Sequence, residues 1–201
     1  MRPAVFIAVG AAVGVAYWYM RNRASASNGA VGDGGFFDIG GVAGAVFNGG
    51  QAVNMRISFG GIELIKKFEG FRSRVYDANP PKQDWTIGYG HKLKSGESFP
   101  RGVTESEARK LLIEDVGFAE NRVNKNITIR LNQSQFDALV SLAYNLTTKS
   151  WLAAAGRINN GESATSVFGR YVYAGGVKLL GLVTRRNDEI ALYNGGNTGV
   201  A

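Results

Sequence analysis

Apolar residues recur every three or four positions through much of the chain after residue 58, as in amphipathic helices. Ile62, Ile65 and Phe68 follow this spacing and predict a helix that ends at Glu69-Gly70. A glycine at that point is expected to end the helix in the left-handed conformation. The first predicted helix of this region therefore carries an acidic residue at its end.

Two short strands are predicted directly after this helix, over residues 72–76 and 85–89. The Asn79-Pro80-Pro81 sequence between them is typical of a turn. Together these segments predict a small β-hairpin.

The rest of the chain predicts further helices, at about 104–123, 132–143, 163–173 and 182–193. Thr104 and Glu107 form a capping box at the start of the first, and Asn132 caps the second. A helix and a hairpin followed by a mostly helical region predict an α+β fold of two lobes. A cleft between two such lobes is suited to holding a polymer.

A different pattern marks the beginning of the chain, because residues 3–20 contain no charged side chain. At about 1.5 Å per residue, a helix of this length spans about 27 Å, enough to cross the hydrocarbon core of a bilayer. Tyr17, Trp18 and Tyr19 are expected at one interface, because aromatic residues are enriched there. We interpret residues 1–23 as a transmembrane or signal-anchor segment.

Gly10 and Gly14 form a GxxxG motif within this segment, on which two such helices are expected to pair. A cleaved secretory signal is an alternative, since Ala24-Ser25-Ala26 is similar to a cleavage site. A buried helix is a second alternative. Residues 24–57, rich in glycine, alanine, serine and asparagine, are interpreted as a flexible linker to a domain at 58–201.

Composition narrows the chemistry that this domain can perform. The chain has no cysteine and one histidine, His91, which excludes thiolate zinc sites, cysteine nucleophiles and multi-histidine metal sites. The net charge of +7 points to a polyanionic partner. Nucleic acid is not expected, because the basic residues form no single basic helix and no RNA-binding motif. Anionic lipid and an anionic cell-wall polymer remain.

Three carboxylates, Glu69, Asp77 and Asp84, lie within sixteen positions of one another in this part of the sequence. Hydrolysis of a glycosidic bond needs two oxygen acids, one to protonate the leaving oxygen and one to activate water or attack. The same spacing is also compatible with a solvated carboxylate at a helix end and an aspartate that caps a turn.

Longer motifs resemble the phage-type lysozymes, the endolysin family of muramidases. The resemblance covers about residues 58–196 and is carried by ordered blocks: FEGFR at 68–72, VY at 75–76, TIGYGH at 86–91, QFDALVS at 135–141, AYN at 143–145, GLVTRR at 181–186, Glu189 and YNGG at 193–196. It implies a lysozyme-like fold and a catalytic domain at 58–201.

In that family the site is a Glu/Asp/Thr triad. The resemblance implies that Glu69 is the proton-donating acid and that Thr86 holds the attacking water. The aspartate departs from the pattern, because Ala78 occupies its usual position and the spacing from Glu69 to Thr86 is two residues longer than usual. We assign Asp77 as the base, with Asp84 as the substitute.

Three further residues of this region are expected to bind substrate or orient the site: His91, Tyr89 and Asp84. In the family pattern the histidine closes the motif in a structural role, bonding near the catalytic glutamate. Trp85 and Tyr89 are expected in the core of the hairpin. Arg185 and Arg186 are expected to be structural, bonding core carbonyls or pairing with Glu69.

The resemblance implies hydrolysis of the β-1,4 bond between N-acetylmuramic acid and N-acetylglucosamine in peptidoglycan, with inversion and without a metal or organic cofactor. A lytic transglycosylase acting on the same bond is the alternative. The expected location is a membrane, either the host inner membrane facing the periplasm or a phage virion membrane. In the second case phage virion components are further partners.

Overall fold

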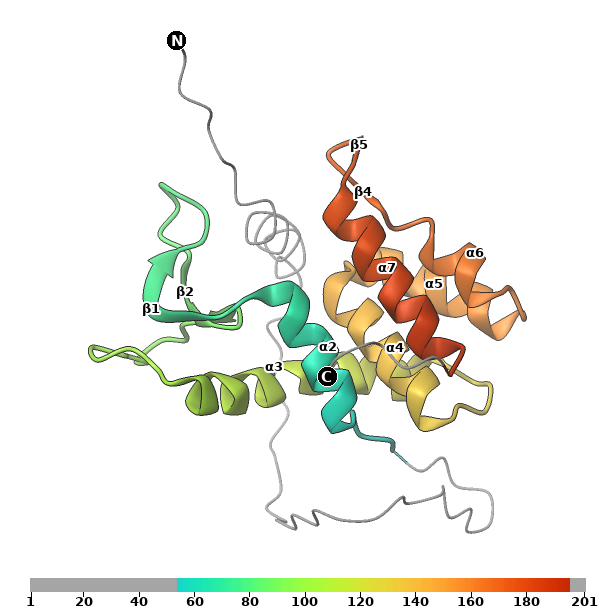
Figure 1. The fold of residues 1–201 in the computed structure, drawn as a ribbon, viewed down its shortest axis with the longest axis horizontal. Helices are drawn as coiled ribbons and strands as arrows, with labels where there is room; N and C mark the ends of the chain where they lie inside the picture. The colour runs from blue at the N-terminus through green and yellow to red at the C-terminus, as the bar shows by residue number, and fades with distance from the viewer. Residues whose placement is uncertain (1–53, 196–201) are drawn as a thin grey trace.

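The computed structural model describes residues 54–195 (Figure 1). The predicted membrane segment at 3–20, the Gly10–Gly14 pairing motif and most of the predicted linker lie outside these residues. Elements follow in the order α2 (Phe59–Glu69), β1 (Arg72–Asp77), β2 (Trp85–Gly88), β3 (His91–Lys92), α3 (Glu105–Asn126), α4 (Gln133–Asn145), α5 (Thr148–Asn159), α6 (Ala164–Phe168), β4 (Tyr173–Ala174), β5 (Val177–Lys178) and α7 (Leu180–Tyr193).

The strands form two small antiparallel sheets, one of order β1-β2-β3 and one of β4 and β5. Figure 1 shows the three-stranded sheet on one side of the molecule and α4 to α7 on the other, with α2 and α3 connecting the two parts. The predicted α+β class is therefore confirmed. None of the helices between residues 54 and 195 combines the length and the hydropathy that a membrane-spanning helix requires.

Helix α4 is the centre of the core, because all its residues from Phe136 to Asn145 are buried. It packs against α2, α3 and α7. A helix that is buried all round needs apolar side chains on every face, and its sequence supplies them apart from a few polar positions. Those polar positions, Ser141 and Asn145 among them, take part in the site described below.

Helix α2 leads from this core to the sheet. Ser58 caps its first turn by accepting the N–H of Gly61. Gly70 at its end has the positive φ (71°) predicted for a glycine, but its ψ of 147° is extended rather than left-handed helical. The backbone therefore passes straight from α2 into β1, and Glu69 lies at the junction of the helix and the sheet.

Residues 55–57, predicted as part of the linker, pack onto the domain instead. The N–H of Ile57 donates to Glu120 at 2.8 Å, and the N–H of Ser58 donates to Asp137 at 2.9 Å. Met55 exchanges two backbone hydrogen bonds with the Asn124 side chain, each of 3.0 Å. Both carboxylates are buried and need donors, so they hold this stretch of backbone in place.

Part of the predicted helix at 163–173 is wrong. Helix α6 ends at Phe168, and β4 and β5 form a hairpin around Gly175 and Gly176, which have φ of 57° and 81°. Two consecutive residues with positive φ form a tight hairpin turn, a conformation that glycine adopts without steric cost. Helix α5 and strand β3 were not predicted.

Candidate active site

Glu69 joins the helical part of the molecule to the sheet. Its side chain is 11% exposed, and its Oε1 accepts a hydrogen bond from Nη1 of Arg185 on α7 at 2.9 Å. Its Oε2 lies beside Gly90, where a Cβ would be 3.9 Å away. One carboxyl oxygen is therefore engaged by a cation, while the other faces a residue that has no side chain to cover it.

Arg185 is buried, and two carboxylates surround its guanidinium. Besides Glu69, it donates from Nε to Glu189 at 3.2 Å and contacts the carbonyl of Ser141 at 3.4 Å. Burial opposes its charge, but Glu69 and Glu189 outweigh that effect and raise the pKa of the guanidinium. Arg185 is therefore a fixed cation whose position is set from α4 and α7 together.

Glu189 completes this buried network. It accepts the hydroxyl of Ser141 at 2.6 Å and pairs with Arg186, whose Nε lies 2.7 Å from its second oxygen. Arg186 also donates to Asn145 at 3.1 Å. The motif blocks on α4 and α7 thus have one physical role: they form a polar network that supports the partner of Glu69. The sequence predicted a structural role for both Arg185 and Arg186, but it did not indicate which of the two pairs with Glu69.

Thr86 shares one face of the sheet with Tyr76, whose phenol lies within electrostatic reach of Glu69. It pairs in register with Tyr76 on β1 and with Lys92 on β3, so these three side chains share one face. Tyr76 is close enough to Glu69 for the carboxylate to raise the pKa of its phenol, after the larger effect of burial. The Thr86 hydroxyl is buried and donates to the carbonyl of Asp84 at 3.0 Å.

Asp84 lies two residues before Thr86 and is 5% exposed. Its Oδ1 is 2.5 Å from Nζ of Lys92, the register partner of Thr86. Its Oδ2 is buried and has no hydrogen-bond partner among the described residues. Asp84 therefore has one carboxylate oxygen paired with Lys92 and one buried oxygen without a donor from residues 54–195, two residues before Thr86.

Asp77 has a different environment. Its two oxygens accept the backbone N–H groups of Asn79 at 2.9 Å, Gln83 at 3.1 Å and Asp84 at 2.9 Å. Its register partner is Trp85, so it lies on the face opposite to Thr86. These contacts make Asp77 the residue that organises the loop between β1 and β2, the turn-capping role that the sequence also allowed.

His91 is buried between two carboxylates. Its Nδ1 lies 2.8 Å from Asp115 and its Nε2 lies 3.0 Å from Glu97. The hydrogen bond with Asp115 is the main cause that raises the pKa of His91, against the opposing effect of burial. The expected bond near Glu69 is not made, because β3 directs the ring toward α3 instead. A structural role is consistent with this environment.

Tyr89 connects the sheet to two helices. Its hydroxyl donates to Glu105 at 2.7 Å, and Nζ of Lys66 lies 5.3 Å from the centre of its ring. It is buried, as expected for the core of the hairpin. The same expectation is wrong for Trp85, which is 46% exposed because it alternates with the buried Thr86 along β2.

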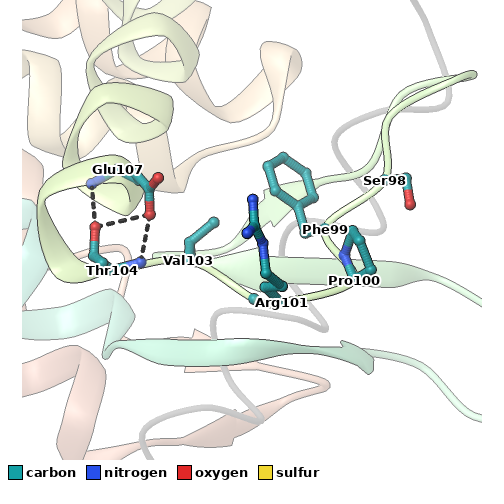
Figure 2. Close-up of a pocket in the computed structure, with 8 residues that line it drawn as sticks. Ser98, Phe99, Pro100, Arg101, Val103, Thr104 and Glu107 are labelled. Atoms are coloured by element: carbon teal, nitrogen blue, oxygen red, sulfur yellow. Dashed lines mark hydrogen bonds between the residues drawn. The ribbon is translucent and has the colours of Figure 1, made fainter.

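A pocket of about 450 Å³ lies between the loop after β3 and the start of α3 (Figure 2). Figure 2 shows Arg101 between Phe99 and Val103, with the capping box of Thr104 and Glu107 at one end. None of the candidate catalytic residues lines this pocket. Over residues 54–195, no group of three or more acidic or histidine side chains is arranged to hold a metal ion.

The order of the elements and the acid at the end of α2 define a lysozyme-like protein. The structure is similar to an endolysin from an Escherichia coli O157:H7 phage, FAHEc1, with a TM-score of 0.62 and 29% identity over 71% of this chain and 96% of that one. It is also similar to the muramidase domain of SpmX from Asticaccaulis excentricus, with a TM-score of 0.61 and 32% identity over 69% and 97%.

The family model for phage lysozyme matches residues 66–189, and the chain belongs to that family. An endolysin of Bacillus phage PZA is 40% identical over 146 residues, which are 71% of this chain and 56% of the relative. The chain thus spans little more than half of that relative's length. A SAR-endolysin of Enterobacteria phage P21 is 30% identical over 112 residues, 52% of this chain and 66% of the relative.

Proposed function

We propose that the protein hydrolyses peptidoglycan at the β-1,4 bond between N-acetylmuramic acid and N-acetylglucosamine. The observation that carries this proposal is the pairing of Glu69 with the buried Arg185, which leaves Oε2 open beside Gly90. A carboxyl group held in this way has one oxygen fixed in space and one free to carry a proton. Membership of the phage lysozyme family supports the same reaction.

Glu69 acts as the general acid and transfers its proton from Oε2 to the glycosidic oxygen. General acid catalysis of this kind contributes about 10²- to 10⁴-fold to a rate. Thr86 holds the attacking water. Because its hydroxyl proton is used by the carbonyl of Asp84, its lone pairs remain to accept a hydrogen bond from that water.

Asp84 accepts the second proton of the reaction in this proposal. Its Oδ1 pairs with Lys92, the register partner of Thr86, and its Oδ2 has no hydrogen-bond partner among the described residues. Asp77, which the sequence favoured, already accepts three backbone N–H groups on the opposite face. In this proposal the longer loop, with alanine at position 78, supplies the carboxylate from Asp84, the residue directly before β2.

We also propose that residues 3–20 bring the enzyme to a membrane, with residues 24–54 as the tether. Support comes from the uncharged sequence itself and from the likeness to two proteins named SAR-endolysins. Two settings fit this proposal, the host inner membrane facing the periplasm and a membrane of the phage virion. Immunodetection in purified particles separates them, because only the second places the protein in virions.

The full chain and its Glu69→Gln variant, incubated with purified peptidoglycan, test the reaction. We expect clearing by the first and a loss of at least 100-fold in rate for the second, with unchanged circular dichroism. Glu114→Gln is the matched control, because Glu114 is an exposed acid on α3. Equal clearing by wild type and Glu69→Gln would reject the assigned acid. Products with a reducing muramic acid end indicate hydrolysis, whereas anhydromuropeptides indicate the transglycosylase alternative, which the endolysin relatives do not favour.

A further inference from the structure

Tyr76 and Arg72 form a stacked pair next to the site. The guanidinium carbon of Arg72 lies 4.8 Å from the centre of the Tyr76 ring. Tyr76 is half-buried, and its phenol is close enough to both charges for Arg72 to lower its pKa and Glu69 to raise it, after the larger effect of burial. The stacked pair therefore lies within electrostatic reach of the proposed acid.

Arg72 and Arg74, both on β1, have no acidic partner in the described part of the chain, unlike the other cations around the site. Lys66 pairs with Glu63 and Glu105, Lys67 with Asp188, Lys92 with Asp84, and Arg185 with Glu69 and Glu189. No carboxylate of residues 54–195 lies within ion-pair distance of Arg72, which is exposed at the start of β1. Its donors are thus available to a ligand.

The stacking also limits the freedom of the side chain. A guanidinium held over an aromatic ring presents its N–H donors in a fixed plane, which matches the two oxygens of a carboxylate. Less conformational entropy is lost on binding from such a pre-organised position. An exposed arginine without this support, such as Arg74 on the same strand, contacts only a carbonyl, that of Pro100 at 3.4 Å.

We infer that Arg72, supported by Tyr76, binds a carboxylate of the peptide that branches from the muramic acid of the substrate. This inference rests on the proposed function. In peptidoglycan the peptide is attached to one of the two sugars joined by the bond that Glu69 protonates. Its carboxylates are therefore the anionic groups that accompany the reacting bond most closely. Arg72 makes the enzyme prefer glycan that carries peptide over bare glycan.

The test compares the full-length protein on two substrates, soluble glycan strands with their peptides and the same strands after an amidase has removed them. We expect wild type to have a kcat/KM at least tenfold higher on the first. In Arg72→Gln this ratio falls toward one, through a higher KM on peptide-bearing strands with kcat largely kept. Arg72→Lys restores part of the preference, because it keeps the charge without the planar fork.

Arg74→Gln is the matched control, because it removes an exposed arginine from the same strand and is expected to keep the wild-type ratio. Tyr76→Leu is expected to reduce the ratio as well, since it removes the support of the guanidinium. An unchanged ratio in Arg72→Gln, or an equal loss on both substrates, overturns the inference while leaving the proposed function intact. Failure of wild type to cleave either substrate overturns the proposed function and this inference with it.

Discussion

Nη1 of Arg185 donates to Oε1 of Glu69 at 2.9 Å, joining two residues that are 116 positions apart in the sequence. The contact connects the end of α2 to α7. The same guanidinium also donates to Glu189 and to the carbonyl of Ser141. It fixes one oxygen of the proposed acid and leaves the other beside Gly90. Orientation of the acid therefore depends on the packing of the helical part of the molecule.

Replacing Arg185 with methionine is expected to reduce both stability and activity. It leaves the carboxylates of Glu69 and Glu189 without their shared cation, and removing one partner of a buried ion pair costs about 3–5 kcal/mol. Urea unfolding measures this loss, and kcat on purified peptidoglycan is expected to fall at least tenfold.

Arg185→Lys is the matched variant for this site. It keeps a positive charge but cannot donate to Glu69 and Glu189 from one planar group, so an intermediate loss is expected in both measurements. If Arg185→Met left kcat unchanged in protein that remains folded, the pairing with Glu69 would have no role in positioning the acid.

Substitution of the two aspartates is expected to affect different quantities, kcat for Asp84 and the free energy of unfolding for Asp77. Asp84→Asn removes the proposed proton acceptor beside Thr86, and a loss of about 10²-fold in kcat is expected. Asp77→Asn cannot accept all three backbone N–H groups, because one of its two side-chain heteroatoms becomes a donor. Its free energy of unfolding should fall by about 1–3 kcal/mol, with kcat within about threefold of wild type.

Circular dichroism melting and steady-state assays of both aspartate variants provide the measurement. The reverse outcome, with Asp77→Asn inactive and Asp84→Asn active, would identify Asp77 as the base, as the sequence favoured.

The free energy of unfolding is expected to decrease above about pH 6.5, the pKa of histidine in an unfolded chain. The pKa of His91 is raised in the folded protein, mainly by its hydrogen bond with Asp115. The folded state therefore binds the proton more tightly, and this stabilisation is complete below the unfolded pKa and is lost as pH rises through the folded pKa. Urea unfolding between pH 5 and 9 measures the decrease.

His91→Gln is expected to flatten this dependence, since the slope from one group is at most about 1.4 kcal/mol per pH unit and the variant lacks the group. Glu97 acts in the opposite direction. The backbone N–H of Lys94 is the main cause that lowers the pKa of Glu97, so its contribution is lost as pH falls through the folded pKa. An equally steep loss above pH 6.5 in His91→Gln would show that another group is responsible.

Two adjacent glycines at the start of α2 are expected to respond in opposite ways to alanine. A Cβ on Gly60 would meet only Ser58 Oγ at 3.6 Å, so Gly60→Ala should stabilise the helix by up to about 1 kcal/mol. A Cβ on Gly61 would lie 2.5 Å from Ile57 and 2.9 Å from Asp137. Gly61→Ala should therefore destabilise the protein by about 1–3 kcal/mol.

Thermal and urea unfolding of the two single variants compare them directly, with each serving as the control for the other. Similar stability of both variants would show that residues 55–58 do not pack against α2 and α4 as closely as the contacts indicate.

Local patterns were sufficient for much of the fold. Apolar periodicity, the capping box at Thr104, the N-cap at Asn132 and the turn sequence at Asn79 predicted α2, α3, α4, α7 and the first hairpin, because each depends on neighbours within a few residues. The hairpin of β4 and β5 was not predicted, because strands of two residues are too short to show a periodic pattern.

The sequence by itself determined the family, the fold class and the placement of Glu69 at a helix end, since these follow from residue type and local order. Only the tertiary structure decided the partners: Arg185 for Glu69, Lys92 for Asp84, and Asp115 and Glu97 for His91. It also separated Asp77 from Thr86 by strand register, which places them on opposite faces of the sheet. Such relations depend on packing between distant segments, which a local pattern does not encode.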